Sequence, residues 1–285
     1  MSTNIEEVVT PDRDDAVAAV AKASMLGKKK RQRKSWIQTS SRLGAVVVFL
    51  ILWSVAAGTL VDTFYLPEPT AVAEEIWDWI LDGSLWTNIM ATMVPAAQGF
   101  LIGGISALVL GYLFAMSKTV SMVLEPFVAA AYGIPVVALV PLLILWLGIG
   151  RSLAVGVSAI VVFFLIFYNV YFGIKDVKQE FIDQVRIAGA SQWDLVMRVR
   201  LPSALVWVVA SLKLAVPHAL VGVVVAEFLT GSEGLGYMLS SNAAQFNAAG
   251  TFASVVVLAA ISFALDRIVF MISRRALMWK ETAER

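Results

Sequence analysis

Uninterrupted apolar runs of about 20 residues recur along this chain of 285 residues, and they restrict its fold more than any other feature. An α-helix of that length crosses the hydrocarbon core of a bilayer. Because an unpaired backbone N–H or C=O group is costly in hydrocarbon, a spanning chain must form helices or a closed barrel. Continuous runs, rather than short segments of alternating polarity, select helices. The sequence therefore predicts an all-α polytopic membrane protein.

The composition agrees with that fold class. Hydrophobic residues make up 59% of the chain and charged residues 15%, which is too apolar for an ordinary soluble domain. The formal net charge of +1 gives no overall bias toward nucleic acid, so no nucleic-acid partner is expected. With no cysteine and one histidine, disulfides and thiolate catalysis are excluded and little remains for metal chemistry. We expect no catalytic residue, no metal site and no cofactor bound by this chain.

Apolarity and the positions of prolines predict about six spans. The expected spans are 43–61, 86–116, 122–147, 152–174, 203–226 and 249–273. Pro126, Pro135 and Pro141 fall within the third span, where missing backbone hydrogen bonds are expected to kink or break the helix. Residues 227–247 are expected to form an outer loop with a short helix. Residues 70–82 place their apolar positions on one face, which fits an interfacial helix on the outer surface or a simple surface helix equally well.

The distribution of basic residues supports this order of spans, because cytoplasmic loops carry an excess of Lys and Arg. Of the 22 lysines and arginines, only Arg151 falls outside, while Lys213 lies near the inner end of the fifth span. The basic run at 28–34 is therefore interpreted as a topology signal, and both termini are expected to be cytoplasmic. The expected divisions are a disordered basic tail at 1–42, a transmembrane domain at 43–273 with a cytoplasmic loop at 175–202, and a cytoplasmic tail at 274–285.

Residues 183–202, with the sequence DQVRIAGASQWDLVMRVRLP, form a polar island between long apolar runs. A polar segment of this length is a poor solute for a bilayer. It begins with the triplet Asp183-Gln184-Val185, continues after three residues to Gly189, and ends nine residues later with Val199-Arg200-Leu201-Pro202. The glycine permits a tight reversal, and the proline suits the first turn of the following span. We expect the polar island to be a cytoplasmic element on which a separate motor protein acts, the alternative being a generic polar loop.

This spacing resembles the motif of binding-protein-dependent ABC importer permeases. In that family an E-A-A triplet, a glycine and I-x-L-P form two short helices at a turn. The triplet departs from the family pattern, with Asp for Glu and Gln-Val for Ala-Ala. The resemblance implies that the polar island couples the membrane part to an ATPase. The residues to which it assigns that role are Asp183, Arg186, Ile187, Ala188, Gly189, Ala190, Ser191, Trp193, Asp194, Leu201 and Pro202.

Segments outside the polar island narrow the resemblance. Residues 66–69 (LPEP), 141–150 (PLLILWLGIG), 225–228 (VAEF) and 234–237 (GLGY) are similar to permeases that import sulfonates, taurine, nitrate, bicarbonate or thiamine-precursor pyrimidines. The resemblance implies a type I-like ABC importer permease fold and a location in the bacterial cytoplasmic (inner) membrane. It also implies a homodimer, two copies of an ATP-binding subunit that hold ATP and Mg, and an extracytoplasmic substrate-binding protein. The implied cargo is a small, often anionic solute.

A competing hypothesis is a standalone secondary transporter or channel that needs no ATPase. No duplication of three spans is visible in the sequence, although inverted repeats are typical of many secondary transporters. Glu125 and Asp266 lie near the inner ends of their spans, so no deep carboxylate suits a proton relay. These observations favour the permease of an importer.

Four polar residues in or near the spans are candidates for the translocation path: Tyr132, Lys213, His218 and Glu227. Lys213 could attract an anion, or it could extend its amine to the inner interface. His218 follows Pro217, and its imidazole could act in transport or simply bond a carbonyl group that the kink frees. Tyr132 could merely bond between helices.

Glu227 is expected at the outer edge of the fifth span, where an interfacial carboxylate is cheap and a role in gating is open. The glycine-rich residues 231–236 follow it. They lack the Lys-Ser/Thr pair and the preceding strand of a phosphate-binding loop. They are expected to form a tight outer loop instead.

Overall fold

The computed structural model describes residues 40–41, 44–175, 179–195 and 201–276, and every named element within them is a helix. The chain divides into two units, Met1–Pro69 and Thr70–Arg285. The expected disordered tail at 1–42 and the C-terminal residues 277–285 lie almost wholly outside the described residues. The all-helical fold predicted from apolarity is confirmed.

Among the described residues of the first unit is an apolar helix, Gly44–Thr59, whose side chains from Val46 to Leu52 are exposed. Gly58 has a φ of 80° near its end and donates its N–H to the carbonyl oxygen of Val61 at 2.8 Å. This turn ends the helix, because a left-handed residue cannot continue it. The exposed apolar surface suits a lipid environment.

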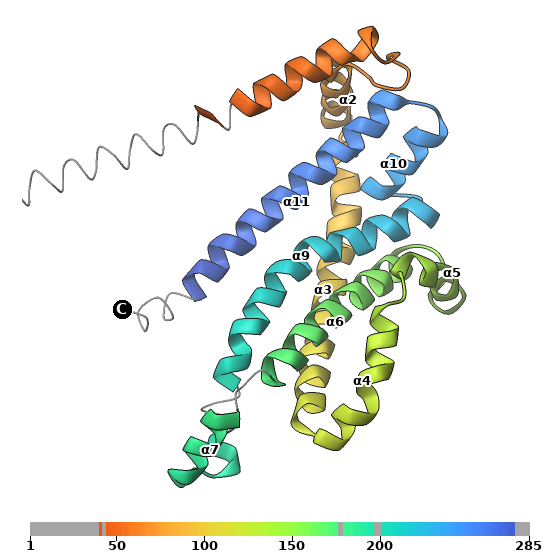
Figure 1. Ribbon diagram of the computed structural model, residues 1–285. Helices are drawn as coiled ribbons and strands as arrows, with labels where there is room; N and C mark the ends of the chain where they lie inside the picture. The colour runs from red at the N-terminus through yellow and green to blue at the C-terminus, as the bar shows by residue number, and fades with distance from the viewer. Residues whose placement is uncertain (1–39, 42–43, 176–178, 196–200, 277–285) are drawn as a thin grey trace, which may run out of the picture. The chain divides into compact units, whose positions relative to one another are not determined.

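The helices from α2 onward, all but α8 labelled in Figure 1, lie in the second unit except for Pro69 at the start of α2. They are α2 (Pro69–Leu81), α3 (Ser84–Met116), α4 (Lys118–Tyr132), α5 (Val136–Leu147), α6 (Arg151–Lys175), α7 (Gln179–Ile187), α8 (Gln192–Leu195), α9 (Leu201–Thr230), α10 (Leu235–Ala244) and α11 (Ala248–Ala276).

Four apolar stretches in the described residues are long enough to cross a membrane. They are Ser84–Met116, Arg151–Lys175, one within Trp207–Ala244, and Ala248–Ser273. The bent pair α4–α5 makes a fifth if it counts as one span, and Gly44–Thr59 is shorter than the others. The six runs predicted from apolarity are all helical, but the number of spans is approximate. The outer segment expected at 227–247 contains α10, and the helix expected at 70–82 is α2.

The third expected span is not one continuous helix. Thr119–Tyr132 and Val136–Leu147 meet at an angle of 96°. The break falls at Pro135, because proline lacks an N–H group and disfavours helical geometry at the residue before it. Pro126 and Pro141, by contrast, lie inside α4 and α5. Of the three prolines that could break the span, only one does so.

The contact between α3 and α6 is built on small residues. Gly99, Gly103, Ala107 and Gly111 recur at every fourth position of α3 and are buried, which lets two helix backbones approach closely. A Cβ atom on Gly103 would collide with the carbonyl oxygen of Ala159 on α6. The sequence signal for this contact is the four-residue spacing of small side chains. That spacing is hard to recognise because the whole run is apolar.

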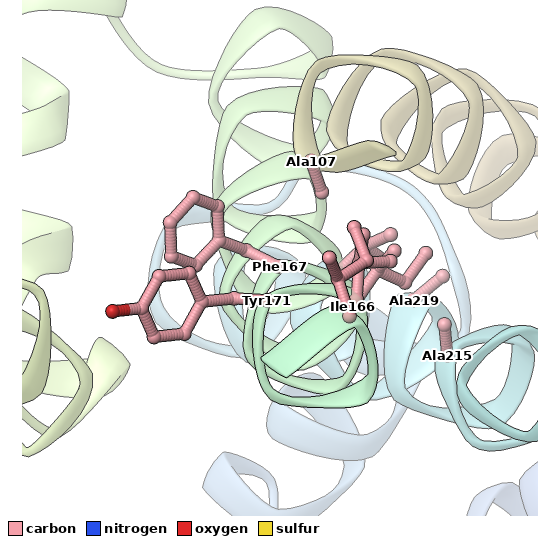
Figure 2. Packing of buried hydrophobic residues seen from close by; sticks show 9 residues of the cluster. Ala107, Ile166, Phe167, Tyr171, Ala215 and Ala219 are labelled. Atoms are coloured by element: carbon pink, nitrogen blue, oxygen red, sulfur yellow. The ribbon is translucent and has the colours of Figure 1, made fainter. Parts of the chain in front are cut away.

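Helix α6 lies between α3 and α9. Figure 2 shows Ala107 of α3 on one side of Ile166, and Ala215 and Ala219 of α9 on the other; all four are nearly inaccessible to solvent. The hydroxyl of Ser158 on α6 donates a hydrogen bond to the backbone carbonyl of Ala219 at 3.0 Å. Helix α6 is therefore the central element of the buried core, and the candidate functional residues described below are positioned around it.

Candidate coupling and translocation sites

The polar island folds into two short helices joined by a left-handed glycine. Gly189 has a φ of 86°, and its N–H donates to the carbonyl of Arg186 at 2.9 Å. The N–H of Ala190 donates to the carbonyl of Val185 at 3.2 Å. These two bonds form a Schellman motif, which ends α7 and reverses the chain. The helix-turn-helix expected from the glycine spacing is present.

A reciprocal capping box begins α8. Ser191 donates its N–H and its hydroxyl to the Asp194 carboxylate, at 3.1 and 2.6 Å, and accepts the N–H of Asp194 on its own hydroxyl oxygen at 3.2 Å. Such a box satisfies the free N–H groups at a helix start. On α7, Arg186 and Asp183 approach each other at 4.0 Å, and both side chains are about half exposed. The polar residues of the island therefore stabilise its own shape.

Two large apolar side chains of the polar island point to solvent. Ile187 is 87% exposed and Trp193 is 70% exposed, whereas Ile182 and Leu195 are buried. Figure 1 shows α7 at the end of the second unit opposite to α2 and α10. An exposed isoleucine and tryptophan on a projecting helical turn have the composition of an interface anchor.

The remaining coupling candidates are placed less fully. Ala188 lies in the reversal after α7. Leu201 and Pro202 open α9, as the proline at the first turn predicts, but their side chains are not described. Residues 196–200 between α8 and α9 lie outside the described residues.

Glu227 lies in the last turn of α9, and its side chain is buried, with only 6% exposed. Its Oε2 atom accepts the Thr92 hydroxyl of α3 at 2.9 Å and the N–H of Gly236 at 2.9 Å. Thr92 in turn accepts the N–H of Leu235 at 2.8 Å. The carboxyl group turns inward because the start of α10 offers backbone donors that would otherwise be buried without partners. The tight loop expected at 231–236 is thus held by these hydrogen bonds to Thr92 and Glu227.

The glycines of this loop are needed for the close approach. Gly234 has a φ of 101° and donates its N–H to Asn88 of α3 at 2.7 Å. A Cβ atom at Gly234 would collide with the Glu227 carboxyl group, and one at Gly236 would lie 2.6 Å from the Val224 carbonyl oxygen. The loop glycines are therefore explained by their close packing against α3 and α9. A role in binding phosphate is not needed to account for them.

Replacing Thr92 by valine is expected to loosen the start of α10. Valine has nearly the same shape but neither donates to Glu227 nor accepts from Leu235, and an orphaned buried polar group costs about 1–3 kcal/mol. We expect faster hydrogen–deuterium exchange at the amides of Leu235 and Gly236, measured by mass spectrometry. In the control Thr230→Val, the lost hydroxyl bonds only the Ala226 carbonyl within α9. Exchange at the amides of Leu235 and Gly236 should therefore stay as in the wild-type chain. Equal exchange in both variants would contradict the assignment.

A cavity of about 150 Å³ adjoins Glu227. Its charged lining residues are Arg151, Glu227 and Glu233, and Arg151 donates to the side-chain oxygen of Gln98 at 3.2 Å. Arg151 is the first residue of α6, so this cavity lies at the N-terminal end of α6, against α3 and α9.

A second cavity, of about 160 Å³, lies at the break between α4 and α5. Tyr132 and His218, two of the path candidates, both line it. The Nδ1 atom of His218 lies 2.7 Å from the Leu214 carbonyl oxygen, which is the carbonyl four residues earlier in α9 and not the one that Pro217 frees. The tyrosine of α4 and the histidine of α9 thus line one cavity at the break in the third span.

Lys213 does not reach this cavity. Its ammonium lies 5.9 Å from the ring centroid of Phe270 on α11, a contact within the range of a cation–π interaction. Neither expectation for Lys213, an anion site or an interfacial amine, predicts that contact.

An ionic cluster joins α4 to the inner end of α6. Lys175 and Glu125 form an ion pair at 2.9 Å, and the Tyr171 hydroxyl donates to Glu125 at 2.8 Å. Lys175 also lies over the Tyr171 ring, 4.4 Å from its centroid. Since Lys175 is the last residue of α6, this cluster lies close in sequence to the start of α7. In the described residues, no group of three or more His, Cys, Asp or Glu could hold a metal ion.

The fold and these sites define a class: a polytopic helical membrane protein with a projecting two-helix element and polar groups buried between its spans. The family described as "Binding-protein-dependent transport system inner membrane component" matches residues 99–278. This chain belongs to that family, and it is the permease component of an ABC importer, a transport subunit rather than an enzyme.

Individual comparisons agree. The chain is 33% identical over 238 residues to the riboflavin transport system permease protein RibX of Chloroflexus aurantiacus, covering 82% of this chain and 88% of that protein. It is 26% identical over 249 residues to the taurine transport system permease protein TauC of Escherichia coli, covering 85% and 90%. An inward-facing structure of the MetNI methionine ABC transporter matches the fold with a TM-score of 0.56 at 21% identity, covering 70% of this chain and 98% of that one. The predicted family and membrane location are confirmed.

Proposed function

We propose that the polar island is the element through which an ATP-binding subunit moves this permease, and that the chain forms a path for a small solute delivered by an extracytoplasmic binding protein. ATP and Mg then act on the partner subunit. The observation that carries this proposal is the rigid reversal at Gly189, with Ile187 and Trp193 exposed on either side of it.

The geometry suits the transmission of a rigid-body movement. The Schellman motif ends α7 and the capping box starts α8, so local hydrogen bonds fix the turn between the two helices. A partner with an apolar groove can therefore grip Ile187 and Trp193 and move both helices together. The ion pair between Glu125 and Lys175 gives that movement a route from the inner end of α6 to α4.

We further propose that two copies of this chain and two ATP-binding subunits form the working assembly, with both termini in the cytoplasm. The apolar side chains that α4, α5 and α11 expose leave surface for a second copy as well as for lipid. The basic residues of the polar island and the termini support the orientation.

The solute is expected to be small. The sequence resemblance favours an anion such as a sulfonate, taurine or nitrate, and TauC is named for taurine. RibX, in contrast, is named for riboflavin, which carries a planar heterocycle. The lining of the cavity beside Tyr132 bears on this choice and is considered in the next subsection.

Replacing Ile187 and Trp193 together by serine is expected to release the ATP-binding subunit. Buried aromatic and aliphatic anchors dominate such interfaces, so the recovered subunit should fall about tenfold or more. The measurement is co-purification of the tagged permease in mild detergent, with mass spectrometry to identify and quantify the ATPase.

The control is Trp86→Ser, since Trp86 is also exposed but lies at the start of α3, at the other end of the second unit. It should leave co-purification unchanged. If the wild-type chain brings down no ATPase subunit, the coupling proposal is wrong. If the double variant retains the subunit fully, contact lies elsewhere on the chain.

A further inference from the structure

The cavity at the break between α4 and α5 has aromatic and apolar walls. The break contributes Tyr132, Ile134, Val136 and Leu139, while α6 contributes Phe164 among other apolar residues. These lining residues all belong to the described part of the chain, and none is Lys, Arg, Asp or Glu. An unscreened anion would therefore meet no opposite charge in this cavity, and desolvation would oppose its entry.

The Tyr132 ring is held as one face of the cavity. Its centroid lies 4.5 Å from that of Tyr168 and 6.5 Å from that of Phe164, both on α6. The side chain is still 54% exposed, so the ring retains a free surface. A planar ring of a ligand could stack there, because flat π-systems favour offset stacking.

The polar groups of the cavity complement a neutral heterocycle. The Leu214 carbonyl can only accept a hydrogen bond, so the Nδ1 atom of His218 at 2.7 Å must be the donor. In the neutral imidazole the Nε2 atom is then an acceptor. The Tyr132 hydroxyl makes no hydrogen bond within the described residues, and it can donate or accept. Together these groups offer one acceptor and one adaptable hydroxyl to a ligand with N–H and carbonyl or ring-nitrogen groups.

The size of the cavity agrees with a single ring. Its volume is about 160 Å³. An apolar protein cavity of about 150 Å³ is known to hold benzene.

We propose that this cavity is a solute-binding site that takes a planar, uncharged heterocyclic ring, stacked on Tyr132 and hydrogen-bonded to His218. The proposal rests on the proposed role of the chain as a solute path and specifies the class of solute. It replaces the small anion expected from resemblance, because the cavity pairs a stacking surface with hydrogen-bonding groups, and neither Lys nor Arg lines it.

The absence of native cysteine allows a direct test on the full chain in lipid nanodiscs. A single cysteine is introduced by Val136→Cys, which lines the cavity, and its rate of modification by a small thiol reagent is measured. An aminopyrimidine is one probe and taurine the other. We expect the aminopyrimidine to slow modification in a saturable manner and taurine to have no effect. Adding Tyr132→Leu should raise the concentration for half-protection about tenfold, the loss typical of one stacking contact.

The matched control is Leu145→Cys on the same helix, which is exposed and does not line the cavity; neither probe should protect it. Protection of Val136→Cys by taurine alone, by neither probe, or equally with and without Tyr132→Leu would overturn the proposal. The assay needs no ATPase. A failure here with normal co-purification of the ATP-binding subunit therefore rejects the ring site and leaves the proposed coupling intact.

Discussion

Replacing Gly103 by valine is expected to abolish the folded permease. The added Cβ atom would collide with the carbonyl oxygen of Ala159, a backbone atom of α6 that cannot rotate away as a side chain would. Relief requires separating α3 from α6, and α6 is also the surface on which α9 packs. Overpacking of a core usually costs about 1–3 kcal/mol, and a clash with rigid backbone falls at or above the upper end. Fluorescence-detected size-exclusion chromatography should show loss of the monodisperse peak.

The neighbouring glycine provides the control. A Cβ atom at Gly104 meets only the Cδ1 atom of Ile166, at 3.5 Å, which is ordinary contact. The pair Gly103→Ala and Gly104→Ala therefore tests the same substitution one residue apart on the same helix. We expect Gly103→Ala to lower the melting temperature in detergent markedly and Gly104→Ala to leave it equal or higher, since alanine favours helix over glycine by about 1 kcal/mol. Equal melting temperatures would show that α3 and α6 do not pack through Gly103.

Replacing Gly189 by valine is expected to uncouple ATP hydrolysis from transport. No atom lies within 4 Å of a Cβ added at this position, but the φ of 86° is one that side chains rarely adopt. A left-handed conformation costs an ordinary residue about 1–2 kcal/mol, and the cost is larger for a β-branched one. We expect the Schellman turn to open and the relative direction of α7 and α8 to change. Stimulation of ATPase activity by the loaded binding protein should fall at least about tenfold in the assembled complex.

Asparagine separates backbone strain from other effects of the change. Asparagine tolerates the left-handed conformation at helix ends better than valine, so Gly189→Asn should retain most of the stimulation. The melting temperature of the permease should be unchanged in both variants, because the turn lies outside the buried core. Wild-type stimulation in Gly189→Val would mean that the reversal does not transmit the movement.

Much of the fold can be predicted because its causes are local. The helix expected at 152–174 is Arg151–Lys175, and the helix expected at 86–116 is Ser84–Met116, since transfer of apolar side chains into hydrocarbon is a sum over nearby residues. The third span shows the limit of this reasoning. The presence of three prolines in the run does not by itself say which one breaks the helix: the break falls at Pro135, while Pro126 and Pro141 lie inside α4 and α5.

The two sites differ in the same way. The structure of the polar island can be predicted from the sequence because its glycine and its capping serine act on neighbours only a few residues away. The environment of Glu227 cannot be predicted from the sequence, since its partners include Thr92, which lies 135 residues away. That Tyr132 and His218 line one cavity likewise depends on a 96° bend that no spacing in the sequence specifies.

The sequence by itself determined which segments enter the membrane, where the chain reverses at Gly189, and to which family the protein belongs. These outcomes follow from solvent transfer and backbone preference, which each residue carries wherever it is placed. Only the tertiary structure decided that α6 lies between α3 and α9, that Glu227 is buried under the loop at 231–236, and that an aromatic cavity opens at Pro135. Those outcomes depend on which surfaces meet across long sequence separations. Their physical reason is steric fit: small residues allow the backbones to touch, and the polar groups enclosed there must then find partners in one another.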